Sequence, residues 1–99
     1  MPTVPALEPQ WLRETLAQVR AAYPGGIPDG DLDVVLAALW EGCSDRNFAL
    51  VVETLTGVDR HVAYGVHVVA AARTASRERQ RVAWVHAALA EHGWDPDAP

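Results

Sequence analysis

The sequence predicts an all-α fold, a single-domain bundle of about five short helices. Apolar residues recur at spacings of three and four along most of the chain, which is the period of helices with one buried face. Glycine, proline and capping residues divide these segments at short intervals, as in compact bundles. The length of 99 residues fits one domain, residues 1–99, in which residues 1–8 and 95–99 are expected to be tails.

The first helix is predicted over residues 9–22. Pro9 suits a first helical position, and apolar residues follow at spacings of four, three and four. These apolar residues are Leu12, Leu16, Val19 and Tyr23. The helix therefore has one apolar face that can pack on the rest of the bundle.

A loop over residues 22–31 holds the densest group of prolines and glycines in the chain. Pro24 keeps Tyr23 out of the helical region, so the first helix ends there. Pro24 and Gly25 fit the centre of a type II turn, in which Gly25 supplies a positive φ. Tyr23 and Ile27 are the apolar side chains that we expect to hold this loop against the core.

The second and third helices follow this loop. The second is expected to be capped by Asp29 or Asp31 and ended by Gly42. The third is expected to be capped at Ser44 and ended by Gly57. Their apolar positions are Leu32, Val35, Leu36, Leu39 and Trp40 in the second, and Phe48, Val51, Val52 and Leu55 in the third.

The fourth helix is predicted from its N-cap, Asp59, to Arg73. Its apolar positions are Val62, Val66 and Val69. The density of β-branched residues would also suit a strand, but the absence of a turn signal over this length favours a helix. Gly65 costs about 1 kcal/mol relative to alanine inside a helix, which predicts the close approach of a neighbouring segment.

The last helix is predicted to begin at Thr74 or Ser76 and to end before Gly93. Its inner positions are Val82, Val85 and Leu89. With Gly93 in the C′ position, Trp94 follows at C″ and can contact Leu89, which is the apolar contact of a Schellman ending.

Two stretches of this pattern resemble a known family. Residues 23–28 (YPGGIP) and 89–94 (LAEHGW) are similar to the YPxG(V/I)P and LAxxGWP motifs of an actinobacterial, mainly mycobacterial, family of small helical proteins described only as a domain of unknown function. The resemblance covers most of residues 11–96, although Asp95 stands where members place proline directly after tryptophan. It implies an all-α bundle of about five helices and brings no activity, cofactor or catalytic residue.

The chain is acidic, with a formal net charge of −5, and the charge is unevenly distributed. Residues 1–59 carry a net charge of −6, residues 60–90 carry +4 and residues 91–99 carry −3. The negative total argues against general binding of nucleic acid or of anionic membranes. The lone Cys43, the lack of a signal peptide and the lack of a membrane-spanning apolar run predict a cytoplasmic protein.

Several groups of residues could suggest chemistry, but their spacings do not support it. Asp29, Asp31 and Asp33 alternate like the opening of a calcium loop, yet the required glycine and bidentate glutamate are missing. The histidines form no i, i+4 pair, and Cys43 has no local signature of a nucleophile and is expected to be a core or half-buried thiol. The sequence therefore predicts no metal, no cofactor and no catalytic residue, and so no enzyme.

Two groups remain as candidates for partner binding. The first is Arg73, Arg77 and Arg81, which lie four apart and would form a stripe for an acidic partner or a phosphate group if one helix held all three. The alternative is a solvated face, paired with Glu78 or with acidic residues of the second helix.

The second candidate is the loop at residues 23–28. Its candidate residues are Tyr23, Pro24, Ile27 and Pro28. Bulky residues in a loop on a rigid scaffold often bind a partner. The alternative is that Tyr23 and Ile27 only plug the end of the bundle.

These features predict a non-enzymatic protein-interaction module, with an unknown protein partner or with self-association. The alternative is a small-molecule-binding protein or an accessory enzyme subunit with an apolar pocket lined by tryptophans. A closed cavity at Trp40 or Trp84 with a convergent polar group would favour this alternative. A fully packed core would favour the interaction module.

Overall fold

The computed structural model describes residues 9–95, and within them it confirms the all-α fold. In chain order the elements are α1 (Gln10–Ala22), the 3₁₀ turn η1 (Asp29–Asp31), α2 (Leu32–Glu41), α3 (Asp45–Thr56), α4 (Arg60–Val62), the π-helical η2 (Ala63–His67), α5 (Val68–Arg77) and α6 (Arg79–Ala90). Residues 1–8 and 96–99, which belong to the predicted tails, lie outside the described part. Because α4, η2 and α5 follow one another without a break, we call residues 60–77 the long rod.

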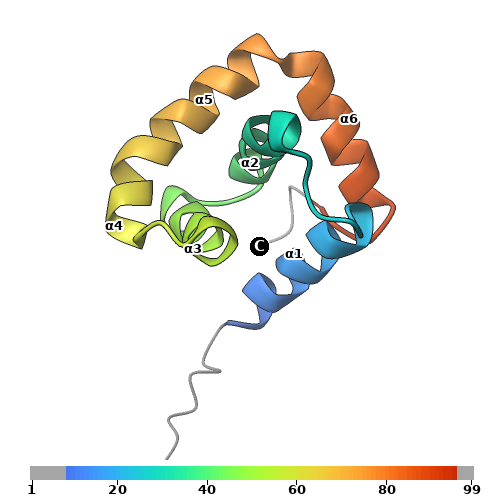
Figure 1. The fold of residues 1–99 in the computed structure, drawn as a ribbon, viewed down its shortest axis with the longest axis horizontal. Coiled ribbons are helices and arrows are strands. Elements are labelled where there is room, and N and C mark those ends of the chain that lie inside the picture. The colour runs from blue at the N-terminus through green and yellow to red at the C-terminus, as the bar shows by residue number, and fades with distance from the viewer. Residues whose placement is uncertain (1–8, 96–99) are drawn as a thin grey trace, which may run out of the picture.

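The central helix is α2, which the other helices surround (Figure 1). The sequence predicted an apolar stripe, but residues 34–39 are buried without interruption, so every side of the helix faces protein. A helix that is apolar all round is stable only in such an interior position. It packs against α5, α6 and α3, and α1 lies across α6 and α3.

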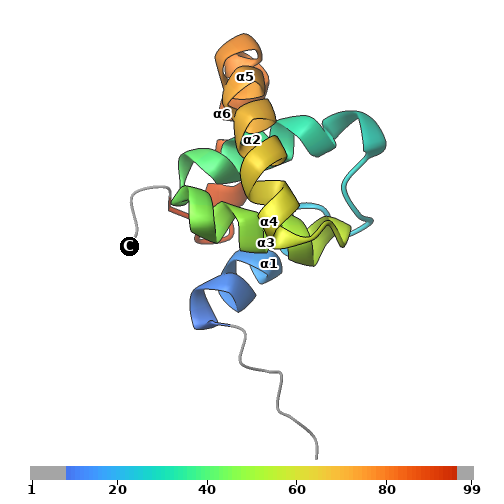
Figure 2. The ribbon, with the colours of Figure 1, turned by 90° about the vertical axis from the view of Figure 1, so that its left-hand side faces the viewer.

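The long rod forms one outer side of the bundle (Figure 2). It packs on α2 and α3, and no other helix of the described residues lies over its outward side. None of the helices in the described part is both long enough and apolar enough to cross a membrane.

Two predicted N-caps are confirmed. Ser44 Oγ accepts a hydrogen bond from the N–H of Asn47 at 3.1 Å, and the carboxylate of Asp59 accepts one from the N–H of His61 at 2.8 Å. Each bond satisfies an amide group that the first turn of a helix leaves unpaired. Gly57 ends α3 with a left-handed φ of 81°, as predicted.

The predicted Schellman ending of α6 is also confirmed. Gly93 has a φ of 92°, and the N–H of Trp94 donates to the carbonyl of Leu89 at 3.1 Å. Both Trp94 and Leu89 are buried in the larger core cluster. The Trp94 ring also lies 5.0 Å from the ring of His86, so the end of α6 is fixed to the core.

The predicted type II turn is wrong. The turn closes where the N–H of Gly26 donates to the carbonyl of Tyr23 at 2.8 Å, but the positive φ of 93° belongs to Gly26 and not to Gly25. A type II turn requires the positive φ one residue earlier, at Gly25. The second glycine therefore supplies the left-handed conformation that lets the chain leave the turn.

The predicted helix boundary at Thr74 or Ser76 is wrong as well. Both residues lie inside α5, and the helical run breaks at Glu78, whose φ of −113° and ψ of 45° are not helical. Continuing the helix past Thr74 buries Ala75 on the same side as Ala71. This burial and the retained backbone hydrogen bonds outweigh a capping preference of about 1 kcal/mol.

The predicted packing of the fourth helix is reversed. Its valines are exposed, with Val62 at 52%, Val66 at 58% and Val69 at 49%. The buried residues of the long rod are the small side chains Ala63, Ala71 and Ala75. Gly65 has open space where a Cβ would lie, so it does not serve a close approach between described segments.

Replacing Gly93 with alanine should destabilise the protein by about 1 kcal/mol, because an L residue with a φ of 92° is strained. The added Cβ would lie 3.7 Å from Gln18 Nε2, which is an ordinary contact. The loss would therefore reflect backbone conformation and not a clash. Urea unfolding followed by circular dichroism measures it.

The matched control is Gly65→Ala. Gly65 has an ordinary negative φ inside a helical rod and open space at its Cβ position. Alanine should therefore leave the free energy of unfolding unchanged or raise it by about 0.5–1 kcal/mol. An equal loss in the two variants would contradict the left-handed ending at Gly93.

Candidate functional site

The structure separates the three arginines that were predicted to form one stripe. Arg73 and Arg77 lie on α5, whereas Arg81 lies on α6, beyond the break at Glu78. The geometric basis of that prediction is therefore wrong. Arg73 and Arg77 are exposed on the long rod, and their role in binding stays a prediction.

Arg81 ties α6 to the segment that precedes α2. Its Nη2 donates to the carbonyl of Gly30 and to the carboxylate of Asp31, both at 3.1 Å, and its Nη1 donates to Glu78 at 3.0 Å. The hydrogen bonds to Glu78 and Asp31 raise the pKa of Arg81. Arg81 was expected either to bind a partner or to pair with acidic residues of this chain. Its contacts with Glu78 and Asp31 agree with the second interpretation.

The predicted capping of α2 by an aspartate side chain is wrong. Neither Asp29 nor Asp31 forms a side-chain cap, because the Asp31 carboxylate pairs with Arg81 instead. The chain enters α2 through the 3₁₀ turn, in which the N–H of Asp31 donates to the carbonyl of Pro28 at 2.8 Å. The hydrogen bond from Arg81 to Asp31, which lies 50 positions away in the sequence, therefore takes the place of the predicted capping bond.

The loop at residues 23–28 is anchored by its apolar residues. Tyr23 and Ile27 pack against the core, whereas Pro24 and Pro28 are exposed. Burial, together with the nearby charge of Asp31, raises the pKa of Tyr23. The packing matches a plug at the end of the bundle, and the surface left for a partner consists mainly of two prolines.

A surface that sequence reasoning missed lies on the outward side of the long rod. We call Val62, Val66 and Val69 the valine ridge. With Tyr64, which is 53% exposed, they make four of the five large hydrophobic side chains that are exposed among residues 9–95. Scattered exposed apolar residues are ordinary, but their concentration within residues 62–69 makes this stretch a candidate contact surface.

The π-helical segment explains why this ridge faces outward. In a regular α-helix, the eight steps from Ala63 to Ala71 would place the side chains of these two alanines about 80° apart around the helix axis. The extra residue in the wide turn of η2 reduces this to about 20°, so both alanines can face the core. The valines then occupy the opposite side of the rod.

A groove of about 480 Å³ runs between α3 and the beginning of the long rod. Ala49, Leu50 and Tyr64 contribute its apolar lining. Arg46, Arg60 and His61 contribute its cationic and polar lining. Arg60 is paired with Glu53 at 2.7 Å, and this hydrogen bond lowers the pKa of Glu53.

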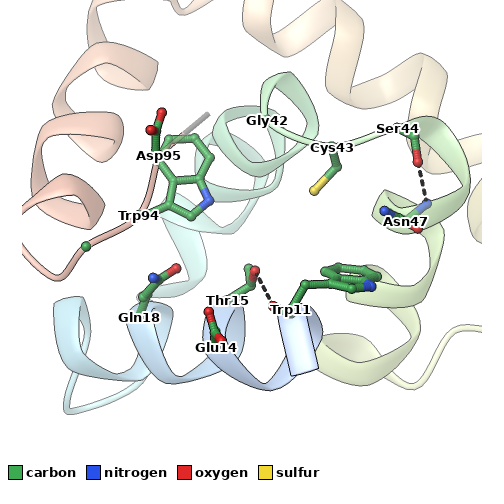
Figure 3. Close-up of a pocket in the computed structure, with 11 residues that line it drawn as sticks. Trp11, Glu14, Thr15, Gln18, Gly42, Cys43, Ser44, Asn47, Trp94 and Asp95 are labelled. Atoms are coloured by element: carbon green, nitrogen blue, oxygen red, sulfur yellow. Dashed lines mark hydrogen bonds between the residues drawn. The ribbon is translucent and has the colours of Figure 1, made fainter. Parts of the chain in front are cut away.

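A second pocket, of about 410 Å³, lies between α1, the α2–α3 connection and the end of α6 (Figure 3). Trp11 and Trp94 line it, and the thiol of Cys43 points into it between them. Burial raises the pKa of this thiol to about 11, so it is protonated at neutral pH. Ser44 Oγ already accepts the capping hydrogen bond, so neither group is an activated nucleophile.

The tryptophans singled out for a pocket are not the ones that line this pocket. Trp40 Nε1 donates to Asp45 at 3.0 Å, and Trp84 is 64% exposed beside a small groove of about 140 Å³. The Trp11–Trp94 pocket lies between elements that are distant in sequence. Spacing along the chain therefore gave no signal for it.

Comparison of this chain with known protein families, with characterised proteins and with solved structures finds no match. The resemblance of residues 23–28 and 89–94 to an actinobacterial family stays a prediction.

Replacing Arg81 with glutamine should loosen the segment before α2. Hydrogen exchange of residues 29–33 should become faster, because the contacts to Gly30 and Asp31 are lost. The free energy of unfolding should fall only slightly, since these ion pairs are exposed to solvent, which screens them. Arg77→Gln, on the exposed side of α5, is the control and should change neither quantity. Unchanged exchange in both variants would rule out the tie.

The alkylation rate of Cys43 by iodoacetamide should rise about tenfold per pH unit from about pH 8 to about pH 10, because the thiolate is the reactive form and the pKa is about 11. In the chain unfolded by urea, the rate should level off above about pH 9. The thiol of Cys43 keeps its proton to a higher pH in the native state than in the unfolded chain. The free energy of unfolding should therefore fall as the pH rises from about 9 towards 11. Mass spectrometry measures the rates, with Cys43→Ser as the blank. Identical profiles in the two states would contradict the burial of the thiol.

Proposed function

We propose that this chain is a non-enzymatic protein-interaction module of the cytoplasm. The observation that carries the proposal is the valine ridge, whose three side chains are about half exposed on the long rod. Exposing three valines to water is unfavourable, and contact with a partner surface would remove this cost. The proposed contact surface is the ridge, continued along the same rod by Arg73 and Arg77.

The state of the core supports the same proposal. No charged or polar residue of the described part is buried, and the buried side chains pack in two clusters around α2. The buried side-chain polar atom of the described part that lacks a hydrogen-bond partner is Nδ1 of His67, which lies beside a groove of only about 100 Å³, smaller than the pockets that usually hold a small molecule. The loop at residues 23–28 and Arg81 are occupied by internal contacts, so the proposed surface no longer includes Arg81 or depends on the loop.

The Trp11–Trp94 pocket supports a second candidate function, the binding of a small molecule. Two tryptophan rings provide apolar contact area in a pocket of adequate size for a metabolite. This candidate uses a different part of the surface from the valine ridge. One capture experiment can therefore distinguish the two functions.

Immobilised protein should retain a specific protein from a lysate of the source organism, and Val66→Asp should abolish the retention. A charge at the centre of the ridge would have to be buried against the partner, which is unfavourable. Val66 is exposed, so the variant should fold with nearly unchanged stability. Quantitative mass spectrometry of the retained fraction measures the effect.

The matched control is Ala17→Asp, which places the same charge at an exposed position of α1 and should retain the partner. Proteins retained equally by both variants would argue against the ridge. Retention of a metabolite alone would replace the interaction module with the small-molecule candidate.

A further inference from the structure

We propose that the valine ridge binds a second copy of this chain, so that two long rods pack antiparallel in a symmetric dimer. This inference rests on the proposed function, because it names the partner at the same surface. The three valines of the ridge are each about half exposed. A symmetric dimer places the same surface of both copies in contact, so an apolar ridge can be covered by its own counterpart.

The valine ridge lies between two charges of opposite sign. In chain order the row consists of Asp59, Val62, Val66, Val69 and Arg73, which follow one another at spacings of three and four residues. Such spacings place successive residues about one turn apart on the same side of a helix. The wide turn of η2 keeps Val62 and Val66 in line, because their spacing of four residues is close to one turn there too. Asp59 and Arg73, at the two ends of the row, are both exposed.

Neither of these end charges is neutralised by an ion pair within the described residues. The Asp59 carboxylate accepts a hydrogen bond from the N–H of His61, which leaves its charge in place. The neighbouring Arg60 is paired with Glu53 at 2.7 Å instead. Arg73 has no ion-pair partner among residues 9–95. The row is therefore negative at its beginning and positive at its end.

An antiparallel arrangement matches this charge pattern, and a parallel one does not. With a two-fold axis at Val66, Val62 of each copy meets Val69 of the other, and Asp59 of each copy meets Arg73 of the other. A parallel arrangement would bring the two aspartates together and the two arginines together, and like charges in contact are destabilising. Charge complementarity therefore favours a second copy in one orientation and one register.

Gly65 supplies an independent reason to expect a close neighbour. It lies four residues before Val69, and therefore on nearly the same side of the rod. A Cβ at Gly65 would meet nothing within 4 Å, so no described segment packs against it. Glycine inside a helix is unfavourable, but it lets another backbone approach closely. A second rod crossing the ridge would make use of this missing side chain.

The dimer should be weak and reversible. From Asp59 to Arg73 the row extends over roughly 20 Å, and a helix is about 10 Å wide. Such a contact buries less than the roughly 1,200 Å² of a stable specific interface. We therefore expect a Kd of about 0.1–1 mM and a mainly monomeric chain at low micromolar concentration.

Sedimentation equilibrium of the full-length protein from about 10 µM to about 1 mM measures the dimer. Arg73→Glu should weaken it at least about tenfold, because two attractive pairs become repulsive. Adding Asp59→Arg to this variant restores opposite charges across the two-fold axis and should recover most of the lost affinity. Arg20→Glu, at an exposed position of α1, is the matched control and should leave the affinity unchanged. Asp59→Asn keeps a capping side chain without the charge, so its smaller loss separates charge from capping.

Cross-linking tests the register without changing a charge. In a Cys43→Ser background, Val66→Cys should form a disulfide-linked dimer under mild oxidation, because this position lies on the two-fold axis. A mixture of Val62→Cys and Val69→Cys chains should cross-link faster than either variant alone. Ala17→Cys, at an exposed position of α1, is the control and should cross-link slowly. Unfolding curves establish that every variant is folded.

Three outcomes would overturn the proposal. They are a monomeric chain at about 1 mM, equal affinities of Arg73→Glu and the unchanged protein, and cross-linking of Val66→Cys no faster than that of Ala17→Cys. If the chain is monomeric while a different protein is captured in a Val66-dependent way, only the second copy falls as the partner. If that capture fails as well, the proposed function falls with it.

Discussion

The complete burial of α2 is the constraint on which the rest of the structure depends. Residues 34–39 of this helix are buried in succession, so partners are needed on every side of it. The long rod, α6 and α3 supply three of these sides. The Arg81 contacts and the Schellman ending at Trp94 then fix α6, at its beginning and its end, to the elements around it. The hydrogen bonds of Arg81 and of Trp94 thus hold α6 against its neighbours.

Packing around α2 also decides which side chains of the long rod face water. Helices approach closely where small residues meet, and Ala71 and Ala75 of α5 lie beside a helix that itself carries Ala37 and Ala38. Small side chains at these two positions allow the backbones of α2 and α5 to lie close together. The larger, β-branched residues therefore occupy the outward side. The exposed ridge follows from a close helix contact elsewhere on the same rod.

Sequence reasoning predicted several features that local chemistry determines, although the local turn at Gly25 and Gly26 was predicted wrongly. The caps at Ser44 and Asp59 and the ending at Gly93 each depend on a few neighbouring residues, and they are confirmed. It failed where contacts distant in sequence decide. The ion pair of Asp31 with Arg81 displaced the predicted cap, and the burial of Ala75 carried α5 past the predicted boundary. The groove between α3 and α4 could not be predicted either, because its shape depends on how two helices pack.

The most important error was the prediction of which side of the long rod faces the core, because this side decides which residues are available to a partner. Periodicity shows that a helix has an apolar side, and the assumption that the largest apolar side faces the core reversed the orientation. The rod has two apolar sides, one of alanines against α2 and one of valines towards water. The alanine side stabilises the fold through close packing, whereas the valine side contributes little to a lone copy. An apolar side that the core does not use is the strongest argument in this chain for a partner.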